Sequence, residues 1–365
     1  MSVLSVEESR TPPAINHRVP IATIRRMKRM KKLELTIASD YVPSWTVVDG
    51  IRELFQNALD QGDYTWHFAA GTLTLTNRNT SLSTSSLLLG ASTKVGDATT
   101  VGQFGEGYKI ATLVLLRSGK QVEIHTANEV WRPRFVKSRR YGADVLTFFI
   151  DHGVRTKDLI VKVHDLTQEE WDLITASNLH IRQDYSVMHS TEIGDIINLP
   201  GKVFVNGLFV CDFAPYQFGY NFKPGQLRLD RDRKLATDFD LKWLASRMWR
   251  SAEQGINDVL KLLEDDAADV EYVPDLWSIT ALCIAAYERF AARYGANAIP
   301  VSTQAEADKV PESYKAIIVP EGLKRIILGA PSFILPEAMV ETPLKLWYKK
   351  YEHLLTPEAK EEFPW

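Results

Sequence analysis

Residues 46–61 read TVVDGIRELFQNALDQ, and this stretch predicts the helix around which the rest of the chain is organised. Its apolar residues recur at helical spacing and, at about 100° per residue, fill one side of a helix. Glu53, Asn57 and Asp60 follow one another at one-turn spacing and share an arc of roughly 60° on the opposite side. Spacing of this kind is also typical of an amphipathic helix whose polar stripe meets water.

The residue types in this stripe suggest phosphate chemistry. A hard cation such as Mg²⁺ binds oxygen ligands, and a water that attacks a phosphate needs a carboxylate to orient it. Glu53 offers a base, Asn57 a neutral oxygen ligand and Asp60 a further carboxylate. A second motif in the chain decides between this chemistry and a solvated helix face.

That second motif lies in residues 101–116, which read VGQFGEGYKIATLVLL. Gly102, Gly105 and Gly107 punctuate a loop that opens a helix from about residue 108 to 116. Glycines at this place let backbone N–H groups approach phosphate oxygens beside a helix N-terminus. No hydrophobic parallel strand precedes the loop and no GxxxxGK[ST] motif occurs, which argues against a dinucleotide fold and a P-loop. Residues 64–68 and 72–76 predict a hairpin between the two motifs.

Together these motifs resemble those of the GHKL (Bergerat-fold) ATPases, the superfamily of gyrase B subunits, MutL proteins, large heat-shock chaperones and sensor histidine kinases. Residues 53–60, ELFQNALD, resemble the N box, and residues 101–107, VGQFGEG, resemble the second glycine box, most closely in its chaperone form. Residues 90–94, GASTK, are similar to a segment of the ATP lid. The resemblance covers roughly residues 33–165 and implies a two-layer α/β sandwich with a mixed, largely antiparallel sheet.

The resemblance implies ATP and Mg²⁺ as cofactors and gives each motif residue a role. Glu53 would orient and deprotonate the attacking water, Asn57 would bind Mg²⁺, and Asp60 would hold the helix end or reach the water network beside the base. Glycines and backbone amides of the second box would cradle the phosphates, two lysines would contact them, and a threonine would lie near adenine. These further candidates are Gly102, Gln103, Phe104, Gly105, Gly107, Lys94, Lys109 and Thr126. For each lysine, the alternative is an ordinary surface position.

The chain departs from the family pattern at the first glycine box. The expected Asp-x-Gly-x-Gly falls at residues 77–81, which read NRNTS. Asn77 would stand where an aspartate receives the adenine amino group, and its amide oxygen accepts without charge. This departure favours, as the alternative, a degenerate site that binds nucleotide without turnover.

Length and composition predict a protein of several domains. With 365 residues, 45% apolar and 24% charged, the chain is typical of soluble globular proteins. We expect an α+β fold in four parts: a basic arm at 1–30, the ATP-binding domain at 31–180, a transducer-like segment at 181–265, and a smaller α/β and helical region at 266–365. The third part holds a hairpin that turns at Asn206 and Gly207, a long helix at 238–263, and a following acidic linker at 264–274.

The third part also supplies a candidate for the cation that completes many GHKL sites. Residues 230–234 read DRDRK, where alternating charges could aim an arginine at the terminal phosphate. Arg231 and Arg233 are equal candidates, and a surface ion-pair cluster is the alternative.

Charge, cysteine content and hydropathy limit the class of protein and the cellular compartment. A net charge of −3 argues against a wholly basic nucleic-acid binder, and two separated cysteines argue against zinc or a disulfide scaffold. No stretch reaches the ~20 apolar residues of a membrane span, and no signal peptide is evident. We therefore expect a cytoplasmic protein without a membrane partner.

The predicted activity is slow, Mg²⁺-dependent ATP hydrolysis that drives a conformational switch, with nucleotide-dependent homodimerisation, on a macromolecular partner. Basic residues at 18–32 and 132–140 suggest nucleic acid or an acidic protein as that partner, or else plain solvated faces. A structural or interaction protein on the same fold and a chaperone-like ATPase are the alternatives. A compact protein of this kind would suit a phage or a mobile element.

Overall fold

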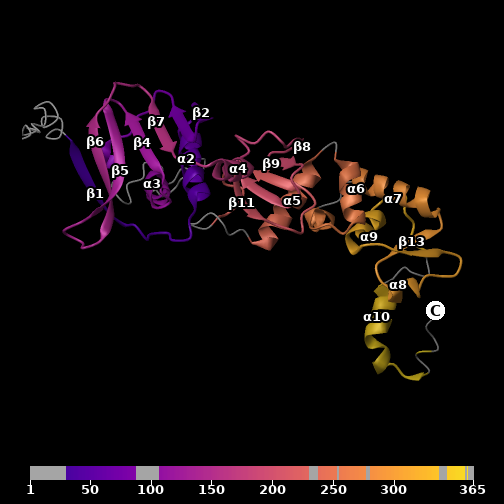
Figure 1. Cartoon of the computed structure of the whole chain (residues 1–365). Coiled ribbons are helices and arrows are strands. Elements are labelled where there is room, and N and C mark those ends of the chain that lie inside the picture. The colour runs from indigo at the N-terminus through magenta and orange to yellow at the C-terminus, as the bar shows by residue number, and fades with distance from the viewer. Residues whose placement is uncertain are drawn as a thin grey trace, which may run out of the picture. The chain divides into compact units, whose positions relative to one another are not determined.

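The computed structural model describes residues 30–87, 107–229, 237–252, 255–276, 280–336, 343–357 and 360. The chain divides into two compact units, Met1–Ile174 and Thr175–Trp365; the bar in Figure 1 colours the first from indigo to magenta and the second towards orange and yellow. Helices and largely antiparallel sheets make up both units, so the predicted α+β class is confirmed.

The first unit is built on a seven-stranded sheet in the order β1-β6-β5-β4-β7-β3-β2. Its strands are β1 (Lys31–Ala38), β2 (Tyr64–Ala69), β3 (Thr72–Asn77), β4 (Gln121–Thr126), β5 (Glu129–Lys137), β6 (Asp144–His152) and β7 (Leu159–His164). All of these neighbours pair antiparallel. The predicted hairpin is confirmed as β2 and β3, which turn at Ala70 and Gly71, both at positive φ.

The organising helix forms as predicted, as α2 (Val47–Gln61). It begins after Thr46, whose N–H and hydroxyl both donate to the carboxylate of Asp49, at 2.8 and 2.9 Å. Its end is marked by Gly62 at φ 69. The apolar face, including Leu54 and Phe55, is buried.

Helix α3 (Gly107–Arg117) packs against α2, and together they form the second layer of the unit. Helix α2 contacts β2 and β3, while α3 contacts β4 and β5. Arg117, at the end of α3, donates to the carbonyls of Tyr41, Val42 and Trp45 in the segment that leads into α2. The short turn η1 (Thr84–Leu87) and α4 (Gln168–Ala176) complete the unit.

Strand β5 was not among the strands predicted from the sequence, and it contains Pro133, which cannot donate to a ladder. The structure accommodates the proline where β5 has a strand on one side only. Strand β4 pairs with β5 over Glu129–Trp131, and from Arg132 to Lys137 the paired neighbour is β6 alone.

The second unit begins with a five-stranded sheet in the order β11-β10-β12-β9-β8. Its strands are β8 (Val187–Ser190), β9 (Gly194–Ile197), β10 (Lys202–Val205), β11 (Leu208–Asp212) and β12 (Gly219–Phe222). Strands β10 and β12 are parallel and the other pairs antiparallel. The predicted turn is confirmed, with Asn206 at φ 50 and Gly207 at φ 78.

Helices and a small parallel sheet follow. The helices are α5 (Asp238–Ser251), α6 (Ile256–Glu264), α7 (Thr280–Tyr294), α8 (Gln304–Ala307), α9 (Glu321–Leu328) and α10 (Pro343–Tyr351). Strands β13 (Ala298–Val301) and β14 (Lys315–Ile318) pair in parallel. Short 3₁₀ turns are η2 (Ala268–Val270), η3 (Val273–Asp275) and η5 (Glu352–Leu354).

Two expectations for this unit are wrong. The single long helix predicted at 238–263 is two helices, with Gly255 as the N-cap of α6. The predicted acidic linker at 264–274 is packed structure, since it carries η2 and the fully buried Asp269. One hydrophobic cluster includes residues from Ile193 to Ala330. The predicted boundary between the third and fourth parts, at residue 265, therefore does not separate two hydrophobic cores.

Candidate functional site

The fold brings the two sequence motifs of the first unit into contact. Asn57 of α2 faces Gly107, the first residue of α3. A β-carbon built on Gly107 would lie 2.7 Å from Nδ2 and 3.1 Å from Oδ1 of Asn57, well inside normal contact distance. Glycine at this position therefore lets the backbone of the second motif approach the side chain of the first.

Hydrogen bonding fixes which atom of Asn57 can act as a ligand. Its Nδ2 donates to the carbonyl of Glu53, one turn earlier, at 2.7 Å. Because the amide nitrogen is held by the helix, the amide oxygen is the atom left to coordinate a cation. An amide oxygen of this kind fits the hard-oxygen preference of Mg²⁺.

Glu53 lies one turn before Asn57 and is 3% exposed. Arg52 is a neighbouring cation: its Nη2 is 3.9 Å from Glu53 Oε1 and its Nη1 is 3.6 Å from Asp49. Arg52 also lies over the ring of Trp45, 5.6 Å from the ring centre. Glu53 is therefore a buried carboxylate beside a positive charge, not the solvated carboxylate of an exposed helix face.

Asp60, the third residue of the predicted polar stripe, is half-buried and accepts a hydrogen bond from Gln56 at 3.0 Å. Tyr108, the second residue of α3, lies beside this end of α2. Burial raises the pKa of its phenol, the charge of Asp60 raises it further, and a hydrogen bond with Gln61 opposes the rise. Tyr108 thus offers a neutral hydroxyl next to the site. The sequence reasoning missed it, although its place directly after the glycine loop was a usable signal.

Lys109 is also brought to this region, and it is 1% exposed. An ordinary surface lysine, the alternative considered for it, is therefore excluded. Lysines are almost never fully buried without a role for the charge. Its place in the first turn of α3 adds a positive charge next to the start of that helix.

Asn77 ends β3 and ties the sheet to α2. Its Nδ2 donates to the carbonyls of Ala58 and Gly62, at 2.8 and 2.9 Å, and the residue is 3% exposed. An ionised aspartate could make neither bond, because a carboxylate has no hydrogen to donate. The asparagine that departs from the family pattern therefore has a structural task of its own, and its amide oxygen remains the atom for a ligand.

Thr126, at the end of β4, is 1% exposed and also has a structural task. Its hydroxyl accepts from the N–H of Leu82 at 2.8 Å and donates to the carbonyl of the same residue at 3.2 Å. The predicted contact with adenine would have to share this hydroxyl with the segment that follows β3.

Seven predicted site residues lie outside the part of the chain that the structure describes: Lys94, Gly102, Gln103, Phe104, Gly105, Arg231 and Arg233. The basic arm at 18–29 lies outside it as well. The second basic segment is largely strand β5, where Arg132 donates to Glu123 at 2.7 Å and Arg134 covers the ring of Phe149.

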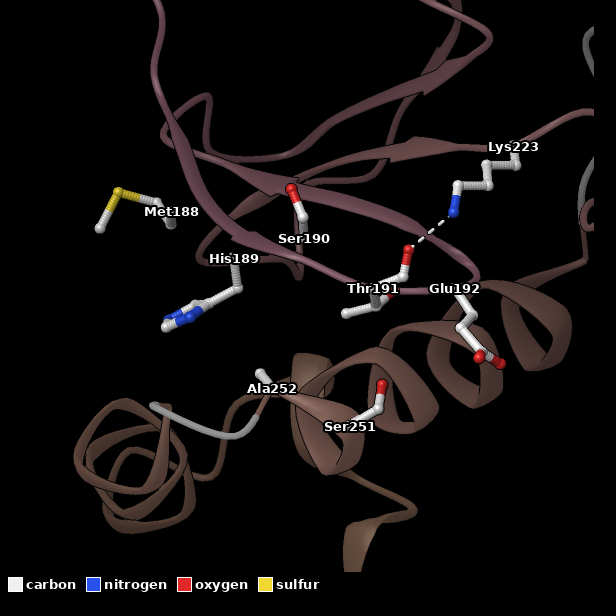
Figure 2. Close-up of a pocket in the computed structure, with 8 residues that line it drawn as sticks. All are labelled: Met188, His189, Ser190, Thr191, Glu192, Lys223, Ser251 and Ala252. Carbon is white, nitrogen blue, oxygen red and sulfur yellow. Dashed lines mark hydrogen bonds between the residues drawn. The ribbon is translucent and has the colours of Figure 1, made fainter.

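The second unit has a hollow of about 660 Å³ between β8 and the end of α5, drawn in Figure 2. Its polar groups bind one another. Lys223 donates to the carbonyl of Thr191 at 2.9 Å, and His189 lies 3.1 Å from Asp258. Glu192 also lines the hollow. Because Glu192 is negatively charged and Lys223 already donates to a backbone carbonyl, this hollow does not favour phosphate binding.

The described residues contain no group of three or more His, Cys, Asp or Glu side chains placed to hold a metal ion. Among their helices, none combines the length and apolar character needed to cross a bilayer.

Comparison with known proteins leaves the family open. No family model matches the chain. The chain is similar to an uncharacterized protein of Mycoplasma pneumoniae, with 24% identity over an alignment of 225 residues that covers 56% of this chain and 91% of that protein. Because that relative is itself uncharacterized, it adds no function to the geometry above.

Proposed function

We propose that this chain is a divergent GHKL-type ATPase that binds ATP with Mg²⁺ and hydrolyses it slowly. The observation that carries the proposal is the contact between Asn57 and Gly107. These residues belong to two motifs that were recognised separately in the sequence, about fifty residues apart, and the fold packs them together. The contact sets Asn57 of the polar stripe against the start of α3, whereas a solvated stripe would face water.

The residues around this contact can share the work of hydrolysis. Glu53 would accept a proton from the attacking water and orient it, because it is a buried carboxylate one turn from Asn57. Asn57 would hold the cation through its amide oxygen, while Glu53's carbonyl fixes the amide nitrogen. Bound Mg²⁺ would supply charge neutralisation on the phosphates. Lys109 and the first turn of α3 would add positive potential beside them.

The proposal is tested with Glu53→Gln, which keeps the size of the side chain and removes the base. We expect Mg²⁺-dependent hydrolysis to fall by about 10²-fold or more, while ATP binding measured by calorimetry is retained. Glu169→Gln is the matched control, because Glu169 is an exposed glutamate in the first turn of α4. If the wild type binds no nucleotide, or if Glu53→Gln hydrolyses ATP like the control, the proposal fails.

A second function, nucleotide binding without turnover, is favoured by one specific observation. The amide nitrogen of Asn77 donates to the carbonyls of Ala58 and Gly62. The end of the site proposed for the base is therefore held by hydrogen bonds that the family's usual aspartate could not donate. The same experiment separates the two functions. Binding of ATP by both wild type and Glu53→Gln, with hydrolysis by neither, would select the non-catalytic switch.

We also propose that the nucleotide cycle acts on a macromolecular partner, with nucleic acid as the first candidate. On β5 and its following turn, Arg132 is paired with Glu123, while Lys137 and Arg139 are exposed. Nucleic acid bound through such cations should lose affinity steeply as salt rises. Binding to a single-stranded or double-stranded oligonucleotide that does not change between low and high salt would exclude this partner.

A further inference from the structure

A separate hollow of about 600 Å³ lies at one end of the seven-stranded sheet. Three connections surround it: the segment after β3, the turn from β4 to β5, and the loop from β6 to β7. They contribute Asn79 and Ser81, then Asn128, then Arg155, Thr156 and Lys157. The ends of these strands meet here because Asn77 pairs with Leu159 and Glu129 pairs with His152.

Hydrogen bonds tie the three connections to one another in pairs. The N–H groups of Gly153 and Thr156 donate to the carbonyls of Asn128 and Ala127, at 2.8 and 2.7 Å. This joins the β6–β7 loop to the β4–β5 turn. The hollow is therefore bounded by loops with a fixed spacing, which lowers the entropic cost of binding a ligand.

The segment after β3 is joined to both of the others. The N–H of Asn79 donates to the carboxylate of Asp158 at 3.0 Å, which links it to the β6–β7 loop. Thr126 links it to the β4–β5 turn through the backbone of Leu82. Each of the three connections thus has a bond to each of the others.

The charge in the hollow is positive. Arg155 and Lys157 are exposed and make no ion pair within the residues that the structure describes. The nearest carboxylate in the loop, Asp158, accepts the N–H of Asn79 and is half-buried. Arg78, next in sequence to Asn79, lies 4.0 Å from Asp63. Two cations without a carboxylate partner therefore remain beside amide and hydroxyl groups that can donate hydrogen bonds.

We propose that this hollow binds the phosphate or pyrophosphate group of a small phosphorylated ligand through residues other than Asn57 and Gly107. Arginine and lysine provide charge-assisted hydrogen bonds to phosphate oxygens, and the side chains of Asn79 and Asn128 are placed to add neutral ones. A volume of this size suits a nucleotide-sized compound, since ligand pockets commonly measure about 300–1,000 Å³.

The test is calorimetric titration of sodium pyrophosphate into the full chain without Mg²⁺. We expect Arg155→Gln/Lys157→Gln to weaken binding at least ~10-fold, because two charge-assisted contacts are removed. The charge-matched control, Lys137→Gln/Arg139→Gln, removes two exposed cations from β5 and its following turn and should keep the wild-type affinity. Asn57→Ala should keep it too, because Asn57 is not among the residues that line the hollow.

Each contrary result overturns the proposal. Absence of pyrophosphate binding by the wild type would do so, as would equal losses in the two double variants, which would indicate general surface charge. Loss in Asn57→Ala alone would place the ligand in the ATPase site. Binding of a short single-stranded oligonucleotide without any binding of pyrophosphate would show a nucleic-acid surface. Circular dichroism of each variant checks that its fold is intact, which is expected for the two double variants because all four of their substituted side chains are exposed.

Discussion

Asn57 of α2 and Gly107 of α3 lie so close that no side chain fits between them. A β-carbon on Gly107 would be 2.7 Å from Nδ2 of Asn57, and the same Nδ2 donates to Glu53 at 2.7 Å. Any side chain at residue 107 must therefore displace the group that we propose as the Mg²⁺ ligand. A substitution at residue 107 should therefore affect Mg²⁺–ATP binding and the stability of the fold to different extents.

Gly107→Ala is expected to weaken Mg²⁺–ATP binding with little loss of stability. The atom in the way is the end of a flexible side chain, and alanine favours a helix over glycine by up to about 1 kcal/mol. We expect a midpoint of urea unfolding close to that of the wild type and a clear loss of nucleotide affinity by calorimetry.

A double-mutant cycle checks that the clash with Asn57 is the cause. In an Asn57→Ala background the space is open, so Gly107→Ala should stabilise the protein and should have no further effect on nucleotide affinity. Equal effects of Gly107→Ala in both backgrounds would show that the contact between the two residues is irrelevant.

Asn77→Asp is expected to destabilise the protein, although it restores the residue type usual in the family that the sequence resembles. Both hydrogen bonds to Ala58 and Gly62 would be lost, and a buried carboxylate would face two carbonyl oxygens near the C-terminal end of α2. We expect a loss of about 2–4 kcal/mol in the free energy of unfolding, measured by urea denaturation.

Asn77→Ala provides the comparison, because it removes the same hydrogen bonds without adding a charge. It should cost less than Asn77→Asp. An aspartate variant as stable as the wild type and tighter in ATP binding would mean that the amide has no structural task.

The parts of the first unit that carry the site were predictable because local signals agreed with the tertiary structure. Helix α2 combines a helical apolar period with the Thr46–Asp49 capping pair and a glycine end. Gly71 in the β2–β3 turn, and Asn206 and Gly207 in the corresponding turn of the second unit, are residue types that tolerate positive φ. The family resemblance assigned Asn57 and Gly107 to one nucleotide site, but their direct contact was not predicted.

The unpredicted parts are those where a local signal was overruled. Strand β5 contains Pro133, a residue type that disfavours strands, and tolerates it where only β6 pairs with that stretch. Helices α5 and α6 share one core, so Trp249 and Leu260 continue one apolar period across the break before Gly255. Asp269 was assigned to a linker by its charge, and only tertiary donors explain its burial.

Thr126→Val is expected to destabilise the first unit and to loosen the segment after β3. Valine keeps the shape of the side chain but leaves the N–H and carbonyl of Leu82 without their partner, which costs about 1–3 kcal/mol. Thr126→Ser keeps the hydroxyl and should recover most of that loss in urea denaturation. A valine variant as stable as the wild type would show that the hydroxyl does not hold the segment.

Asp269 is expected to give the stability of the second unit a pH dependence. Its carboxylate accepts from the hydroxyl of Tyr220 at 2.6 Å and from the N–H groups of Gln217 and Phe218, at 2.9 and 3.2 Å, and is fully buried. Burial raises the pKa of Asp269, and these hydrogen bonds only partly oppose the rise. Trp249 donates to the Tyr220 hydroxyl at 2.8 Å and completes the network.

An aspartate whose folded-state pKa is raised stabilises the fold fully below the unfolded-state pKa, about 3.9, and progressively less as the pH rises through the folded-state value. Asp269→Asn removes this titration and replaces one acceptor oxygen with a donor, so it should lower stability by about 1–3 kcal/mol at acidic pH. The difference between wild type and variant should then shrink as the pH is raised above the unfolded-state value. Thermal unfolding of both proteins from pH 4 to pH 8 measures it, with Asp266→Asn at a surface position as the control. A difference that stays constant or grows with pH would mean that Asp269 is charged in the folded protein at every pH tested, and that its hydrogen bonds outweigh its burial.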